Sequence, residues 1–220
     1  MKSEVLSLKK IYTAGSQMWF SKEGHLDTKL RGYGCGVVAL HDLGVYRGFA
    51  KASGTRGEYK EHIRRLEKGG LFVFPNLGIA PYYYPLLCDL YLARHHIGVR
   101  IGWGHTAAKE YRCKAAHIKR CLKKDMPVIF AVGPTWPFLF KNKRIALYSM
   151  DRKPTGRGTK AHYMTVLGLL DADGDIWLEV ASWGEQFSIK LSDLAEYSKY
   201  AVPFTTRFYN VYEKKGRRSQ

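Results

Sequence analysis

The sequence has few cysteines, few acidic residues and no long uninterrupted apolar segment. Four cysteines in 220 residues are too few for a disulfide-stabilised scaffold, so the fold must depend on a hydrophobic core. The most apolar stretch, residues 71–92, contains three prolines, an asparagine and an aspartate. A membrane-spanning helix needs about 20 predominantly apolar residues, which excludes this stretch. The N-terminal region also lacks an apolar run of signal-peptide length, and we therefore expect a cytoplasmic protein with reduced thiols.

The shortage of acidic residues leaves a large positive charge. Lysine and arginine number 36 against 19 aspartates and glutamates, which gives a net charge of +17. The basic residues gather in 141–160, in 109–124 and near the C-terminus. A positive field of this size attracts nucleic acid, anionic lipid or acidic substrates. We favour a solvated basic surface, because no nucleic-acid-binding motif is present, and keep an anionic partner as the alternative.

The sequence does contain enough apolar material for a sizeable core. Hydrophobic residues make up 45% and aromatic residues 14% of the chain, which excludes a disordered protein. The first half is typical of helices. Residues 35–47 are apolar on nearly all sides, as in a buried helix. Residues 58–68 and 107–124 have apolar side chains at the three-and-four spacing of an amphipathic helix.

The second half is typical of β-strands, with one short helix near residues 192–199. The predicted strands cover residues 127–132, 162–170, 175–182, 186–191 and 204–212. The Asp173-Gly174 pair predicts a hairpin between two of these strands. The alternating aspartates around it also suggest a calcium loop, but the glycine and glutamate that such a loop requires are misplaced.

These patterns predict an α+β protein with a single domain over residues 1–212. We expect a helical lobe of about 1–125, packed on an antiparallel β lobe of about 126–212, and then a basic tail over 213–220.

Cys35 lies where a glycine-rich turn enters the predicted buried helix. A helix N-terminus carries partial positive charge and unpaired N–H groups, which favour a thiolate and can stabilise an oxyanion. The flanking Gly34 and Gly36 would let a substrate backbone approach closely. The alternative is a buried structural cysteine, and taken alone Cys35 favours that alternative.

A thiolate nucleophile needs a base within hydrogen-bond distance. Of the eight histidines, His162 follows a basic, glycine-containing loop and begins the most strand-like segment of the chain. It stands 127 residues after Cys35, close to the spacing of about 130–150 residues in papain-type enzymes. The two residues therefore predict a Cys–His pair across a cleft. The alternative is a histidine that caps a strand or lies on the surface.

Four short sequence blocks follow one another in a characteristic order: 34–40 (GCGVVAL), 127–129 (PVI), 162–170 (HYMTVLGLL) and 182–184 (SWG). Together they resemble the papain-like cysteine peptidases. The chain is most similar to the double-glycine leader peptidases that mature bacteriocins and to their small stand-alone bacterial relatives. The resemblance spans about residues 14–190. It implies a papain-like fold, with Cys35 as the nucleophile and His162 as the general base and acid.

Two positions depart from the family pattern. The Asn or Asp that orients the histidine in papain-like enzymes is replaced by Ala181, which leaves Ser182, a backbone carbonyl or a water molecule as the candidates for that role. The family's oxyanion-hole glutamine is missing just before Cys35, and Gln17 is the nearest upstream glutamine. Gln17 either folds back on the cleft or is an ordinary surface residue. Trp183 is expected to pack over the histidine or to contact substrate.

The resemblance implies a cysteine-dependent peptidase or amide hydrolase that acts through a thioester, on a peptide or another amide. Transfer of the acyl group to an amine would use the same residues. The alternative is a catalytically inactive papain-like domain that binds a peptide or an anionic partner, which Ala181 favours. A nucleic-acid-binding protein, suggested by charge alone, is a weaker third possibility.

We expect no cofactor and no metal. Cys113, His117 and Cys121 share one side of a predicted helix, but no fourth zinc ligand is evident. We therefore interpret them as the flank of a buried stripe.

Overall fold

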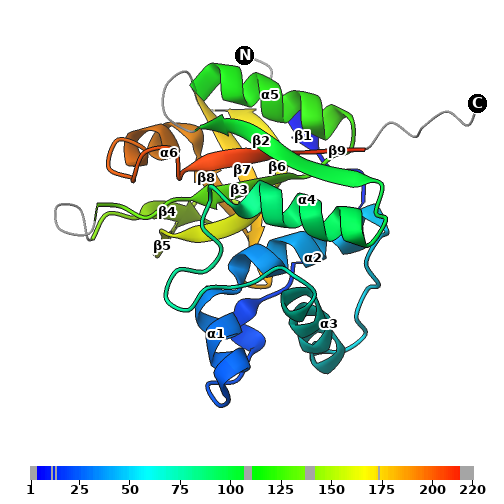
Figure 1. Cartoon of the computed structure of the whole chain (residues 1–220). Helices are drawn as coiled ribbons and strands as arrows, with labels where there is room; N and C mark the ends of the chain where they lie inside the picture. Colours follow the sequence, from blue (N-terminus) through cyan, green and yellow to red (C-terminus); the bar gives the residue numbers. More distant parts are fainter. Residues whose placement is uncertain are drawn as a thin grey trace, which may run out of the picture.

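The computed structural model of the chain describes residues 4–10, 12, 14–106, 111–136, 142–172 and 174–213. They form an α+β structure in which helices pack on both sides of an antiparallel sheet (Figure 1). In Figure 1, α5 and α6 lie above the sheet, and α1 to α4 lie below and in front of it.

The helices are short, and most are amphipathic or buried. Their bounds are η1 Gln17–Trp19 (a 3₁₀ turn), α1 His25–Tyr33, α2 Cys35–Arg47, α3 Arg56–Lys68, α4 Tyr84–Arg94, α5 Tyr111–Lys123 and α6 Leu191–Tyr197. The predicted helices at 35–47, 58–68 and 192–199 are confirmed by α2, α3 and α6, and α5 covers the described part of the fourth. No helix in the described part of the chain is long and apolar enough to cross a membrane.

The described residues contain nine strands in one sheet. The strands are β1 Glu4–Ser7, β2 Val99–Thr106, β3 Val128–Val132, β4 Ile145–Tyr148, β5 Pro154–Thr159, β6 His162–Ala172, β7 Asp175–Ser182, β8 Glu185–Lys190 and β9 Arg207–Glu213. Their order is β2-β9-β3-β6-β7-β8-β4-β5, and β1 pairs with the second half of β6. The predicted hairpin is confirmed, since β6 and β7 pair antiparallel up to Ala172 and Asp175.

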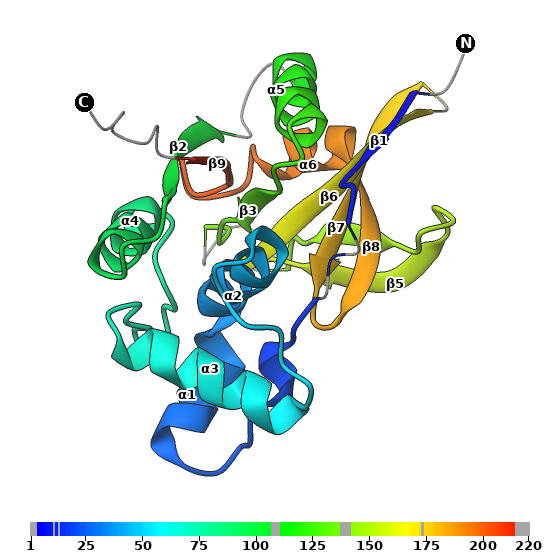
Figure 2. The same ribbon diagram turned by 90° about the vertical axis from the view of Figure 1, so that its right-hand side faces the viewer.

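The two faces of the sheet bury separate hydrophobic cores. In β3, Ile129 and Ala131 join the core under α1 to α4, whereas Val128, Phe130 and Val132 join the core under α5 and α6. This alternation follows from the two-residue period of a strand and explains why segment 127–132 is continuously apolar. Figure 2 shows α2 on the same side of the sheet as α1, α3 and α4.

Two strands lie in the half of the chain where only helices were predicted. The glycines in β2 made this strand look like a loop in the sequence, and both glycines are required by contacts with β9. A Cβ on Gly104 would lie 1.8 Å from the carbonyl oxygen of Phe208 in β9, and a Cβ on Gly102 would meet the Tyr212 hydroxyl. The other strand in this half, β1, has four residues. In the second half, β4 and β5 were not predicted either, and the basic segment before His162 is not a loop as expected but contains β5. Only the last residue of β5 is buried, and β5 lies at the end of the strand order, so its sequence has no apolar alternation to reveal it. At the C-terminal end, β9 begins three residues later than predicted, after Phe204 adopts a positive φ of 62°.

Candidate active site

The junction between α1 and α2 fixes the position of Cys35. Gly34 ends α1 and caps α2, and its N–H donates to the carbonyl of Leu30 at 2.8 Å. A Cβ on Gly34 would lie 2.5 Å from that same oxygen, so only glycine fits this close approach. Cys35 is therefore the first residue of α2. No side chain caps this helix end, so the first backbone N–H groups of α2, which lie next to Cys35, have no side-chain acceptor.

Burial dominates the electrostatics of the Cys35 thiol. The residue is 9% exposed, and desolvation raises the pKa of the thiol to about 11. The backbone N–H groups of Tyr163, Gly36 and Cys35 itself oppose this rise by favouring the thiolate. The helix end thus acts in the predicted direction, but in the closed structure desolvation outweighs it and the thiol is protonated at neutral pH.

His162 is the first residue of β6, and it is 6% exposed. A hydrogen bond of 2.5 Å joins its Nε2 to Oγ of Ser182, at the end of β7. The Trp183 ring stacks on the imidazole with centroids 4.2 Å apart and planes 17° apart. Desolvation lowers the pKa of His162 to about 3, so the ring is neutral at neutral pH. Trp183 reaches this position because the turn after β7 gives it a φ of 51°.

One small cavity is lined by most of the residues that the sequence singled out. These are Gln17, Cys35, His162, Ser182 and Trp183, together with Ala181. The centre of a water molecule has about 10 Å³ in which to move there, which is room for about one water. Among the described residues, no hydrogen bond joins the Cys35 sulfur to the imidazole.

The flanking glycines do not line this cavity. Gly36 instead packs against the Tyr84 ring, at 3.1 Å from where its Cβ would be, and its carbonyl accepts a hydrogen bond from the Tyr84 hydroxyl. Packing within the protein therefore explains the glycine at both positions, 34 and 36, without reference to a substrate.

Gln17 folds back on the cleft and is 8% exposed, so the surface alternative is wrong. It begins η1, which Ser16 caps by accepting the N–H of Met18. Its side-chain Nε2 donates to the Arg31 carbonyl at 3.1 Å, and its Oε1 is buried without a partner. This places an amide group beside Cys35 even though Gln17 precedes it by 18 residues, because α1 loops out between them.

Asp42 also lines the cavity, although no sequence motif singled it out. Its carboxylate accepts the Gly15 N–H at 2.7 Å and the Tyr59 hydroxyl at 2.9 Å. The Gly15 carbonyl in turn accepts the N–H of Gly184, just after Trp183. This chain of bonds ties α2 to the turn that carries Trp183. A signal was present in the sequence: Cys35, Ala39 and Asp42 recur at the spacing of one helical face.

Comparison with known proteins adds little to this description. No protein-family model and no curated protein matches the sequence. Among solved structures, the crystal structure of UfSP from C. elegans matches with a TM-score of 0.46 and 12% identity, over 94% of this chain and 33% of that chain. The chain therefore spans about a third of the length of that protein.

Proposed function

We propose that this chain is a cysteine-dependent peptidase or amide hydrolase of papain-like fold. The observation that supports the proposal is the cavity itself, which is lined by a cysteine at a helix N-terminus and a histidine at a strand start. These residues are 127 positions apart in the sequence. A nucleophile, a base and a group that orients the base are the minimum set for acyl transfer.

In the proposed reaction, Ser182 orients His162. When Nε2–H donates to Ser182 Oγ, the lone pair on Nδ1 is left to accept the thiol proton. The Cys35 sulfur then attacks the carbonyl carbon of an amide. The C–N bond breaks as Nδ1–H gives its proton to the leaving amine, which yields a thioester. Water attacks the thioester with Nδ1 as the base, releasing the acid and restoring the thiol. An amine in place of water would give acyl transfer.

The developing oxyanion has two kinds of donor within the same region. The backbone N–H groups at the start of α2 already act on the sulfur of Cys35. The Gln17 amide lines the cavity, and one of its two N–H groups is taken by the Arg31 carbonyl. The second N–H is the one that we assign to the oxyanion. Substrate binding has to open the cavity first, because the closed form has room for about one water.

The closed cavity also favours a second candidate function, a papain-like domain without catalysis that binds a peptide or an anionic partner. Burial raises the pKa of Cys35 to about 11 and lowers the pKa of His162 to about 3, both of which disfavour the ion pair. Ala181 stands where the orienting Asn or Asp would be.

A degenerate peptide library with mass-spectrometric detection of cleavage tests the two functions. The samples are the wild type, Cys35→Ala and the matched control Cys121→Ala, whose half-buried thiol lies outside the cavity. We expect cleavage by the wild type and the control, and a loss of about 100-fold or more in Cys35→Ala. Equal cleavage by all three would reject Cys35 as nucleophile. Peptide binding without cleavage by any sample would establish the second function.

A further inference from the structure

A second and larger hollow lies between α5 and the end of β9, separate from the cavity around Cys35. This groove has a volume of about 440 Å³, within the range of ligand-binding pockets. It is lined by His117, Arg120, Cys121, Lys124, Met126 and the β9 residues 210–213. None of these residues lines the cavity around Cys35.

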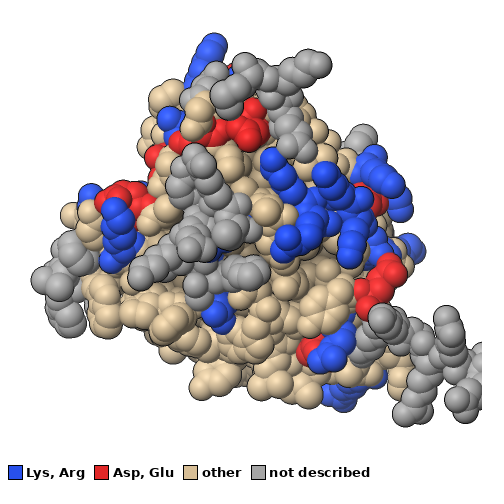
Figure 3. Space-filling model, turned by 90° about the horizontal axis from the view of Figure 1, so that it is seen from above, with Lys and Arg blue, Asp and Glu red and all other residues tan. Residues whose placement is uncertain are grey.

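The rim of the groove is basic and its cations are not neutralised. Arg120, Lys123 and Lys124 are exposed; the first two lie in the last turn of α5, and Lys124 directly follows it. No ion pair within the described part of the chain involves any of the three. The one carboxylate in the lining, that of Glu213, is paired with Arg47. Figure 3 shows lysine and arginine gathered on this face of the molecule.

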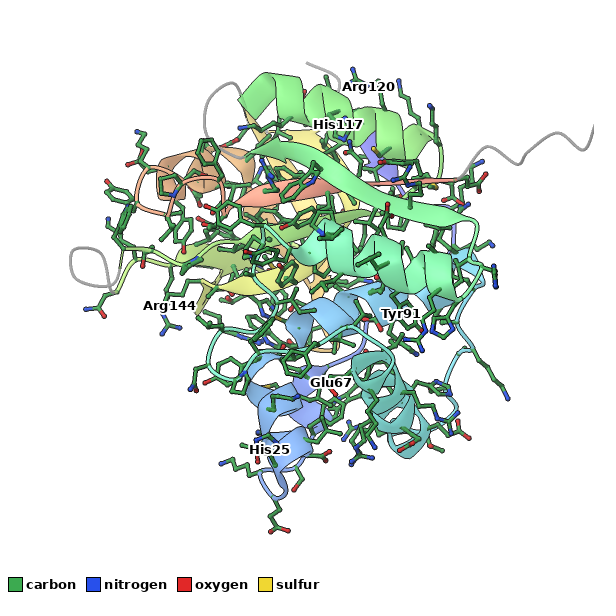
Figure 4. The ribbon with its side chains drawn as sticks, in the orientation of Figure 1. His25, Glu67, Tyr91, His117, Arg120 and Arg144 are labelled. Atoms are coloured by element: carbon green, nitrogen blue, oxygen red, sulfur yellow. The ribbon has the colours of Figure 1, made fainter. Side chains whose placement is uncertain are left out.

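The floor of the groove supplies an aromatic ring and polar atoms. Tyr212 is 42% exposed. Its side chain crosses β2, where its hydroxyl occupies the space that a side chain on Gly102 would need. His117 and Asn210 contact each other through Nε2 and Oδ1 beside it. Figure 4 labels Arg120 and His117 along α5, above the β2–β9 edge of the sheet.

We propose that this groove binds single-stranded nucleic acid. Arg120 and Lys124 take the phosphates, and the Tyr212 ring offers a stacking surface to a base. Unpaired cations beside an exposed aromatic ring are the combination that binds single strands without sequence preference. A single strand supplies a phosphate and a planar base at every step, whereas a flat anionic membrane or an acidic peptide carries no such regular pairing of negative charge with a planar group. This inference is independent of the proposed peptidase activity.

Fluorescence anisotropy with a labelled oligo-dT strand of about 20 nucleotides tests the proposal, in about 50 to 200 mM salt. The groove variant is Arg120→Glu with Lys124→Glu. The matched control is Arg144→Glu with Lys153→Glu, an identical charge change at two exposed positions around β4. We expect the groove variant to bind at least about tenfold more weakly, and its salt dependence, as the slope of log K against log salt, to be shallower by about 1.4.

Tyr212→Ala separates stacking from charge. It should weaken binding several-fold and leave the salt slope unchanged, because it removes no phosphate contact. Circular dichroism melting checks that each variant is folded. Equal weakening by the groove and control variants, or tight binding to phosphatidylserine vesicles with none to the oligonucleotide, would overturn the proposal. Cys35→Ala should bind the strand as the wild type does, so that failure of the peptidase proposal leaves this one standing.

Discussion

The buried imidazole of His162 makes the stability of the fold depend on pH. Its pKa is about 3 in the folded chain and about 6.5 in an unfolded one, because burial disfavours the charged ring. Below pH 6.5 the unfolded chain therefore binds a proton that the folded chain excludes until the pH approaches 3. The free energy of unfolding then falls as the pH falls through this window.

The size of the effect follows from the same two values. At about 1.4 kcal/mol per pH unit, lowering the pH from 7 to about 4.5 should cost the wild type about 3 kcal/mol through His162. His162→Gln removes the titrating imidazole, so the stability of this variant should depend less on pH. His25→Gln is the matched control, the same substitution at an exposed histidine at the start of α1.

Urea unfolding at a series of pH values measures the effect. Between pH 7 and about 4.5, we expect His162→Gln to lose about 3 kcal/mol less stability than the wild type and the His25→Gln control. An NMR titration of the wild type gives an independent readout, in which the His162 ring signals should not shift above pH 4. Identical pH slopes in all three proteins, or an imidazole that titrates near 6.5, would show that His162 is not buried as described.

Three substitutions test the bonds that hold the cavity together. Ser182→Ala removes the hydrogen-bond partner of His162 Nε2. It should lower the free energy of unfolding by about 1 kcal/mol, as measured by urea unfolding. It should also lower any peptidase activity about tenfold or more in the peptide-library assay. Gly15→Ala would put a Cβ 1.8 Å from the Tyr59 hydroxyl, and calorimetry should show a loss of about 1–3 kcal/mol; an unchanged melting temperature would contradict the packing. Asp42→Leu leaves the Gly15 N–H and the Tyr59 hydroxyl without their acceptor, and hydrogen exchange at the Gly15 amide should speed up markedly, whereas unchanged protection would mean that this bond does not hold.

The elements that the sequence predicted well are those with a strong local pattern. Helix α2 is apolar nearly all round, and 11 of its 13 residues are buried. The β6–β7 hairpin has two apolar strands joined through an aspartate-glycine pair. Patterns of this kind depend on neighbours within one helical turn or one strand, so they can be recognised without knowing the rest of the fold.

The sequence did not predict helices and strands whose residues are explained only by contacts with distant parts of the chain. The glycines of β2 look like loop residues until β9 is placed beside them, since only then does the absence of a side chain become a requirement. Helix α4 has a proline in its first turn, a position that helices tolerate, yet in the sequence the prolines of residues 71–92 suggested only an interrupted apolar core.

The sequence by itself determined which residues are chemically able to act: a cysteine between glycines at a helix start, a histidine at a strand start, and a serine at the end of the next strand. Only the tertiary structure decided that Gln17 and Asp42 join them, because α1 loops out and the N-terminal segment returns along α2. It also decided the direction in which each pKa shifts. A helix end favours a thiolate, but burial among several distant segments raises the pKa of Cys35 and lowers that of His162, and no local sequence pattern predicts that burial.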